Sequence, residues 1–535
     1  MFTSFVSFIK SRANSLALIL ISSIVFLPWA SKFIQTIKSG ILSYPSFQRD
    51  EMHYVARARA GWENRNLIEV FSNSNHYSTD GLMQPLEYML FNLLRPLKIL
   101  QIDFVYAYLF VVLVTVIICT WAVYNFFLEF THSKSISFAS TSLLYFNDIF
   151  EKWSTQPSEA LLVSRWPFPM IHYFVIFQFL RLILIRKNVG SLDGIKLSLL
   201  VALGFYSYFY TWQVLGALIL AMLLIFLLRG EKQLFSHLFR YALLGAFLAI
   251  PYLYKQINSL HPEELELSQL FLQSMGKFQT RQIQVTVSML ILLFVAIYLK
   301  TTAKTQLLDL ASIVTFSSIL IYNQQVITGI QIQPGHYHWY WIKPMSFVLI
   351  FLVLTREFLK KDYRKLFASF LAIFLVILSI FQNTMYSEYQ PTRDISIAMS
   401  RIDYKSLSGV VFTNSEMVSD VLVTESVVQV DWHTFSKFYR GQDLSFREGF
   451  DARQVFNDLG VDDSNLQIKD CAQVKTKDVK ACERSLLKVY VESRKIKWII
   501  ITGEVSRGQA IFLAEDFDLV SQSQPVSVFK SRVNH

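Results

Sequence analysis

Long apolar runs recur through most of this chain and restrict its fold more than any other feature. The first covers residues 16–33 and follows the basic residues Lys10 and Arg12. A run of about 18 or more apolar residues is long enough to cross a bilayer as a helix. Because 53% of the 535 residues are hydrophobic and 46 are Phe, the chain has more apolar surface than a soluble globule buries. We expect a multi-pass α-helical membrane protein whose first run is a retained signal-anchor.

The later apolar runs suggest how many times the chain crosses the membrane. They cover roughly 82–100, 104–128, 134–150, 167–185, 195–211, 213–229, 236–254, 284–300, 306–323, 339–358 and 364–382. If Gly81 and Pro167 both lie on the outer side, the chain must cross the membrane an even number of times between them. Three apolar runs occur there. The run at 134–150, or alternatively the run at 82–100, therefore does not span, which leaves about 11 spans.

Basic residues indicate the orientation, because short cytoplasmic loops are rich in Lys and Arg. They gather near 186–196, 229–240, 300–304 and 356–365. These turns and the N-terminus are predicted to be cytoplasmic, with the protein in the plasma (inner) membrane. Lys and Arg at the cytoplasmic ends of the helices then explain the net charge of +10, and no nucleic-acid partner is expected.

The composition changes near residue 390, where long apolar runs stop and charged residues increase. β-rich runs at 409–413, 427–432, 496–502 and 517–529 alternate with helical patterns at 446–459 and 479–494. Alternating strands and helices predict a small α/β domain. We therefore expect a transmembrane domain at 1–389, with a long first outer loop at 37–82, and a soluble extracytoplasmic α/β domain at 390–535.

The first outer loop contains the densest group of ionisable residues near any apolar run, in residues 49–61. Ser46 is predicted to cap a helix there and Gly61 to end it. Asp50, His53, Tyr54 and Arg57 follow the spacing i, i+3, i+4, i+7 and would share one face of that helix. The stripe is either the acid/base part of a sugar-transfer site or the solvated face of a surface helix.

The first loop of this chain has Asp50-Glu51-x-x-Tyr54, followed by Pro85-Leu86 at the start of an apolar run. In this it resembles the first loop of the GT-C glycosyltransferases. The similarity is greatest to the branch of bacterial protein O-mannosyltransferases and lipid A aminoarabinose transferases. This chain has Gln84 where that branch often has a first Pro. The resemblance implies an inverting cell-envelope enzyme that transfers a sugar from a polyprenyl-phosphate donor to a lipid, glycan or protein acceptor on the extracytoplasmic side.

The resemblance implies that Asp50 is the general base, with Glu51 beside it. The leaving lipid phosphate needs cationic support, for which Arg57, Arg165, Arg281 and Lys343 are candidates; interfacial snorkelling is the alternative for the last three. We expect the sugar donor and the acceptor to contact a larger set of residues. This substrate-binding set is His53, Tyr54, Arg57, His76, Gln84, Arg165, Arg281, Gln325, His336, His338 and Lys343.

Residues 323–341 are polar but uncharged, and they combine amides with aromatic residues and two His. Amides suit sugar hydroxyls and rings cover the apolar faces of sugars, so this segment predicts a sugar subsite. An aromatic belt at the membrane interface is the alternative. No cofactor is expected; a divalent metal at His336, His338 and His53 is the weaker alternative, since the spacing His-x-His is a weak signal.

Two other classes of function fit parts of the pattern. A lipid-linked sugar transporter or flippase would need ionisable residues along an intramembrane path. A non-catalytic membrane scaffold would use the C-terminal domain to bind a partner. The chain shows no internal repeat, although many transporters are built from repeats, and this favours the enzyme.

Overall fold

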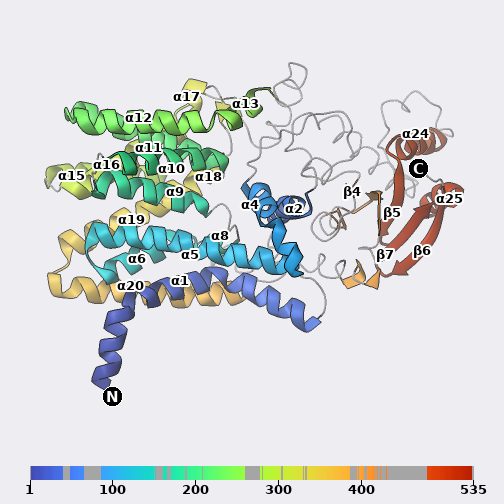
Figure 1. The fold of residues 1–535 in the computed structure, drawn as a ribbon, viewed down its shortest axis with the longest axis horizontal. Coiled ribbons are helices and arrows are strands. Elements are labelled where there is room, and N and C mark those ends of the chain that lie inside the picture. Colours follow the sequence, from blue (N-terminus) through green and yellow to red (C-terminus); the bar gives the residue numbers. More distant parts are fainter. Residues whose placement is uncertain are drawn as a thin grey trace.

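The computed structural model describes residues 2–39, 49–64, 86–149, 151, 161–165, 170–186, 190–207, 209–258, 278–279, 281–302, 305–328, 330–331, 334–385, 395, 397–399, 401–402, 407–415, 418–419, 422, 429–430 and 479–532. Most of these residues are helical, and the long helices lie side by side in one bundle (Figure 1). Helices α2 (Arg49–Glu63) and α4 (Leu86–Leu94) lie at one end of the bundle, between it and a C-terminal sheet (Figure 1). We call this the α2 end.

The described bundle is built from helices that run between the α2 end and the opposite end. They are α1 (Phe2–Ser39), α5 (Phe104–Thr131), α6 (Lys134–Tyr145), α9 (Ile171–Leu180), α10 (Ser191–Tyr206), α11 (Phe209–Leu228), α12 (Lys232–Leu248), α15 (Val287–Thr301), α16 (Thr305–Tyr322), α19 (Lys343–Val353) and α20 (Lys361–Met385). Shorter pieces extend them: η2 (Arg181–Arg186), α13 (Ile250–Asn258), α18 (Pro334–Tyr337), η3 (His338–Ile342) and η4 (Leu354–Phe358). The bundle confirms a helical membrane protein.

The expectation of about 11 spans is wrong for the described residues. Five helices are long and apolar enough to cross a membrane, with candidate spans at Asn14–Ser31, Phe104–Thr131, Tyr210–Leu228, Gln306–Thr328 and Tyr363–Thr384. Two shorter apolar helices cover Ile171–Ile185 and Val287–Thr301. The other predicted spans are not among the described helices that are both long and apolar enough to cross.

Both doubtful runs between residues 82 and 150 are short. The run at 134–150 gives α6, whose 12 residues end at Tyr145. The run at 82–100 gives the 9 residues of α4 and the 3-10 segment η1 (Arg95–Leu100), where Pro96 interrupts the helical pattern. An apolar run therefore identified helix in both places, mostly buried in α6 but mostly half-buried or exposed in α4 and η1, and its length did not guarantee a crossing.

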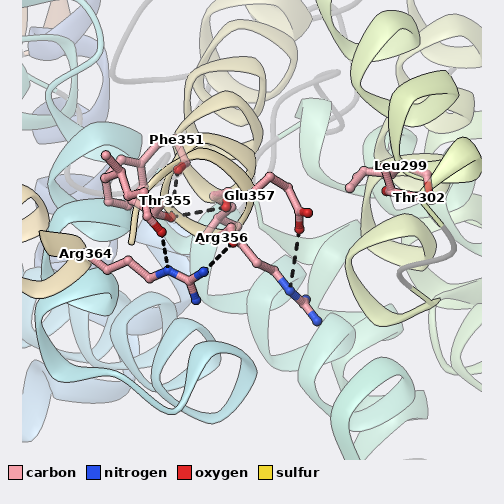
Figure 2. Close-up of polar contacts among 9 residues, drawn as sticks. Leu299, Thr302, Phe351, Thr355, Arg356, Glu357 and Arg364 are labelled. Carbon is pink, nitrogen blue, oxygen red and sulfur yellow. Dashed lines mark hydrogen bonds and ion pairs between the residues drawn. The ribbon is translucent and has the colours of Figure 1, made fainter. Parts of the chain in front are cut away.

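The basic turns lie at the opposite end from α2, as the connection between α19 and α20 shows (Figure 1). Arg229, at the end of α11, pairs there with Asp309 of α16 at 2.7 Å. The side chain of Arg364, on α20, binds carbonyls at the end of η4. Its Nε donates to the Leu359 carbonyl at 3.0 Å and its Nη2 to the Arg356 carbonyl at 2.6 Å, and Figure 2 shows Arg364 beside Arg356. A cation at carbonyls left open by a helix end is favourable, because that end carries partial negative charge. Which side of the membrane this end faces stays a prediction.

The C-terminal sheet has five described strands in the order β4-β3-β5-β7-β6. They are β3 (Val410–Thr413), β4 (Gln429–Val430), β5 (Ile496–Thr502), β6 (Phe517–Ser523) and β7 (Val526–Ser531). Strands β4, β3 and β5 are parallel, and β7 and β6 add an antiparallel hairpin. Helices α24 (Val479–Ser493) and α25 (Arg507–Asp516) accompany them, so the predicted alternation of strands and helices is confirmed. The helix expected at 446–459 and the domain boundary at 390 lie outside the described residues.

Candidate functional site

Helix α2 packs against two separate hydrophobic clusters. Val55, Ala58 and Trp62 belong to the core of the bundle. Ala56 and Ala60 belong to a second cluster, which includes residues of the C-terminal sheet. The helix predicted to carry Asp50 is therefore an internal element between bundle and sheet, so the alternative of a solvated surface helix does not describe its Val55–Trp62 part.

Gly61 does not end α2, contrary to our prediction. The helix continues to Glu63, and Asn64 follows with a φ of 56°, the left-handed conformation that often ends a helix. A Cβ on Gly61 would lie 2.2 Å from the carbonyl oxygen of Tyr88, on α4. Glycine is thus required for the close approach of the two helices rather than for a turn. The predicted cap, Ser46, lies outside the described residues.

Arg57 is buried and forms an ion pair with Glu87 of α4, with Nη2 and Oε2 2.9 Å apart. The side chains are only 2% and 6% exposed. Removing one partner of such a pair would leave a buried charge uncompensated, so the pair connects α2 firmly to α4. Glu87 thus balances the charge that we had expected to support a lipid phosphate.

A chain of aromatic rings leads from α2 to the segment at 323–341. Tyr54 packs against the bundle cluster that includes Tyr210, at the start of α11. The ring of Tyr210 stacks on His336, with the ring centroids 4.5 Å apart. Trp339 and Tyr340 lie 6.3 Å and 6.0 Å from the same imidazole. Residues from three distant parts of the sequence therefore meet at the α2 end of the bundle.

Amide hydrogen bonds hold this segment in place. Gln324 donates to the hydroxyl of Tyr337 at 2.9 Å, and that hydroxyl donates to Gln213 of α11. Gln325 is fully buried and donates to the Gln282 carbonyl at 3.1 Å. The predicted sugar-binding amide Gln325 is thus already engaged in positioning the backbone.

The short strands β1 (Phe278–Gln279) and β2 (Ile330–Gln331) pair antiparallel, with Phe278 opposite Gln331 and Gln279 opposite Ile330. Asn323 strengthens the contact, since it accepts from the Gln284 N–H at 2.6 Å and donates to the Gln284 carbonyl at 3.0 Å. Arg281 lies on this paired segment and is exposed. It is therefore at the surface, where a charged ligand can reach it.

The two histidines of the segment are partly buried. Burial lowers the pKa of His336 to about 4, so this ring is neutral at physiological pH. Burial, and next the nearby charge of Lys343, also lower the pKa of His338. Neutral imidazoles can accept or donate a hydrogen bond but do not support an anion by charge. Within the described ranges no group of three or more His, Cys, Asp or Glu side chains is arranged to hold a metal.

The remaining predicted site residues are distributed as follows. Lys343 forms an ion pair with Glu151, so its charge is balanced like that of Arg57. Arg165 ends the short helix α8 (Leu162–Arg165), and its side chain lies outside the described residues. Asp50, Glu51 and His53 are in α2, but their side chains are outside the description, and His76 and Gln84 are outside it entirely.

Sequence reasoning missed four residues that shape this region: Glu87, Tyr210, Gln213 and Tyr337. Glu87 follows the Pro85-Leu86 pair, but nothing in the sequence marks it as the partner of Arg57. Tyr210 lies in the apolar, aromatic stretch 205–212, which predicts an interfacial belt, whereas the ring is 6% exposed within the core.

No protein-family model matches the chain, and no curated protein matches it in a sequence search. These comparisons identify no GT-C family, so the resemblance in the first loop stays a prediction.

Proposed function

We propose that this protein is a membrane glycosyltransferase that transfers a sugar from a polyprenyl-phosphate donor to an acceptor at the α2 end of the bundle. The proposal places that end on the extracytoplasmic side of the plasma membrane. One observation carries it: α2, which bears Asp50-Glu51-x-x-Tyr54, is packed on the end of a membrane bundle. Its Tyr54 packs against the cluster that includes Tyr210, and the ring of Tyr210 stacks on His336 of the segment 323–341.

The proposed reaction is a single displacement at the anomeric carbon. Asp50 takes a proton from the acceptor hydroxyl or amine, whose oxygen or nitrogen forms the new bond to the sugar. The bond between that carbon and the phosphate oxygen breaks, and polyprenyl phosphate leaves with the electron pair. Arg281, exposed beside the segment, is the described cation best able to approach the leaving phosphate, because Arg57 and Lys343 already pair with carboxylates.

The segment at 323–341 is proposed to hold the sugar. Aromatic faces around His336 suit the apolar face of a pyranose ring, and a neutral imidazole suits its hydroxyls. Because Gln325 and Tyr337 are engaged in internal hydrogen bonds, they are proposed to fix the shape of the subsite rather than to bind the sugar.

The test is turnover by purified protein in liposomes, supplied with radiolabelled polyprenyl-phosphate mannose or aminoarabinose and a mixture of envelope acceptors. Asp50→Asn keeps the shape of the side chain but removes its basicity, so we expect a loss of about 10²–10⁴-fold, and a similar loss for Asp50→Ala. The matched control is Asp103→Asn, since Asp103 caps α5 by accepting from the Val105 N–H at 2.8 Å and Asn caps equally well. Full turnover in Asp50→Asn would remove the proposal.

A flippase for lipid-linked sugars is the second candidate, favoured by two ionisable residues inside the bundle. His172 on α9 is 1% exposed and Asp148, just after α6, is 6% exposed. Intramembrane ionisable residues commonly mark a transport path. The same liposomes separate the two functions, because a flippase would move the labelled lipid between leaflets without transferring its sugar.

A further inference from the structure

One face of the C-terminal sheet is covered by its own helices. Val410 and Phe412 of β3 and Ile499 and Ile501 of β5 form a cluster with Leu487, Val491, Phe512 and Leu513 of α24 and α25. These strands alternate, so the intervening residues point to the other face. A parallel sheet is stable when both of its faces are covered.

The cluster on the second face of the sheet includes two residues of helix α2. Val411 of β3, Ile500 of β5, and Val526 and Val528 of β7 share a cluster with Ala56 and Ala60. Residues 395–422 contribute Ile395, Ala398, Met399, Ile402, Leu407, Val418 and Leu422 to the same cluster, and Tyr88 of α4 borders it. We call the contact of Ala56 and Ala60 with this cluster the α2–sheet interface. Both alanines are at most 1% exposed.

The position of Asp50 follows from helix geometry. At about 100° per residue, Ala56 and Ala60 lie nearly opposite Val55, Ala58 and Trp62, which face the bundle. Position 50 falls between these two faces, on the side of Tyr54 and Arg57. This side of the helix also carries Arg57 and Gly61, which lie against Glu87 and Tyr88 of α4.

We propose that the C-terminal sheet is a positioning element of the transferase site: its contact with Ala56 and Ala60 fixes helix α2, and with it the base Asp50, against the bundle. This inference rests on the proposed function. Ala56 and Ala60 are positioning residues, since they act through the orientation of α2 and touch no substrate. A misplacement of a reacting group by about 1 Å can cost about 10²-fold in rate, so a rigid helix held on two faces is what a base at this position needs.

The first test measures whether the interface exists in solution, using the full chain in liposomes. In A60C the new thiol should be protected from a maleimide reagent until the protein is denatured, with modification at each cysteine followed by mass spectrometry. The control is A514C, because Ala514 is an exposed alanine on α25 of the same C-terminal unit and should react at once. Equal labelling of the two sites would overturn the inference.

The second test measures positioning. A60L adds bulk at the interface, and we expect turnover to fall at least about tenfold, by displacement of the base. The A60L variant should bind polyprenyl phosphate with the affinity and stoichiometry of the wild type, because the bundle is proposed to hold the lipid. The control A514L should change neither turnover nor lipid binding. Turnover within about twofold of the wild type, or loss of polyprenyl-phosphate binding together with turnover, would overturn the inference. Full turnover in D50N removes the proposed function, whereas inactive D50N with active A60L removes only the positioning role.

Discussion

Asn383 on α20 connects three helices through a single buried amide. Its Nδ2 donates to the Ile24 carbonyl of α1 at 2.9 Å and to the Ser164 hydroxyl at 3.0 Å, and its Oδ1 accepts from the Leu161 N–H at 3.1 Å. The Ile24 carbonyl needs such a donor because Pro28, four residues later, has no N–H to continue the helix. The asparagine is 1% exposed and uses every donor and one acceptor position available to it.

The cost of replacing Asn383 by Ala follows from these partners. The Ile24 carbonyl and the Leu161 N–H would both lose a buried hydrogen bond. A buried polar group left without a partner costs about 1–3 kcal/mol, so for these two groups we expect a loss of about 2–6 kcal/mol in the free energy of unfolding.

A double-mutant cycle with Pro28→Ala isolates the contribution of the Ile24 carbonyl. Replacing the proline restores an N–H four residues after Ile24, so Asn383→Ala should cost about 1 kcal/mol less in that background. Equilibrium unfolding in mixed micelles, followed by tryptophan fluorescence, measures each variant; Trp29 is a local probe because its indole donates to the Ser164 carbonyl at 2.7 Å. Thr384→Ala is the control, since within the described part of the chain that hydroxyl bonds to the Ile380 and Phe381 carbonyls of its own helix. Equal costs of Asn383→Ala in the two backgrounds would refute the reasoning.

Two further predictions concern charge. Glu87→Gln should destabilise the fold by about 3–5 kcal/mol, because it removes the Glu87 carboxylate from its buried ion pair with Arg57. R57L/E87L should lie much closer to the wild type, and unfolding of E87Q at the wild-type midpoint would contradict this. Burial lowers the pKa of His336 to about 4, below its unfolded value of about 6.5, so its neutral form is favoured by folding. The contribution of this group to the free energy of unfolding is full above about pH 6.5 and declines as the pH falls towards 4. Unfolding midpoints measured over this pH range should therefore fall more steeply for the wild type than for His336→Phe. Parallel curves would contradict the lowered pKa of His336.

Local patterns in the sequence decided which segments form which elements. The apolar run at 104–128 became α5, the helix predicted at 49–61 became α2, and β-rich runs became strands of the C-terminal sheet. These features depend on the order of neighbouring residues, because side-chain period and apolar run length act within a segment. The chemistry assigned to Asp50 and Glu51 is likewise a local signal, and it remains a prediction.

Only the tertiary structure decided what these segments contact. It showed that α6 and α4 are too short to span and that Arg57 is paired with Glu87. It also showed that Ala56 and Ala60 share a hydrophobic cluster with strand residues some 350 or more positions later in the chain. Packing between distant segments depends on the shape of both partners. The identity of an alanine in the sequence does not show whether it faces lipid, water or a β-sheet. For that reason the sequence could suggest helix α2 as the centre of the proposed site but could not reveal that the helix packs against two separate hydrophobic clusters.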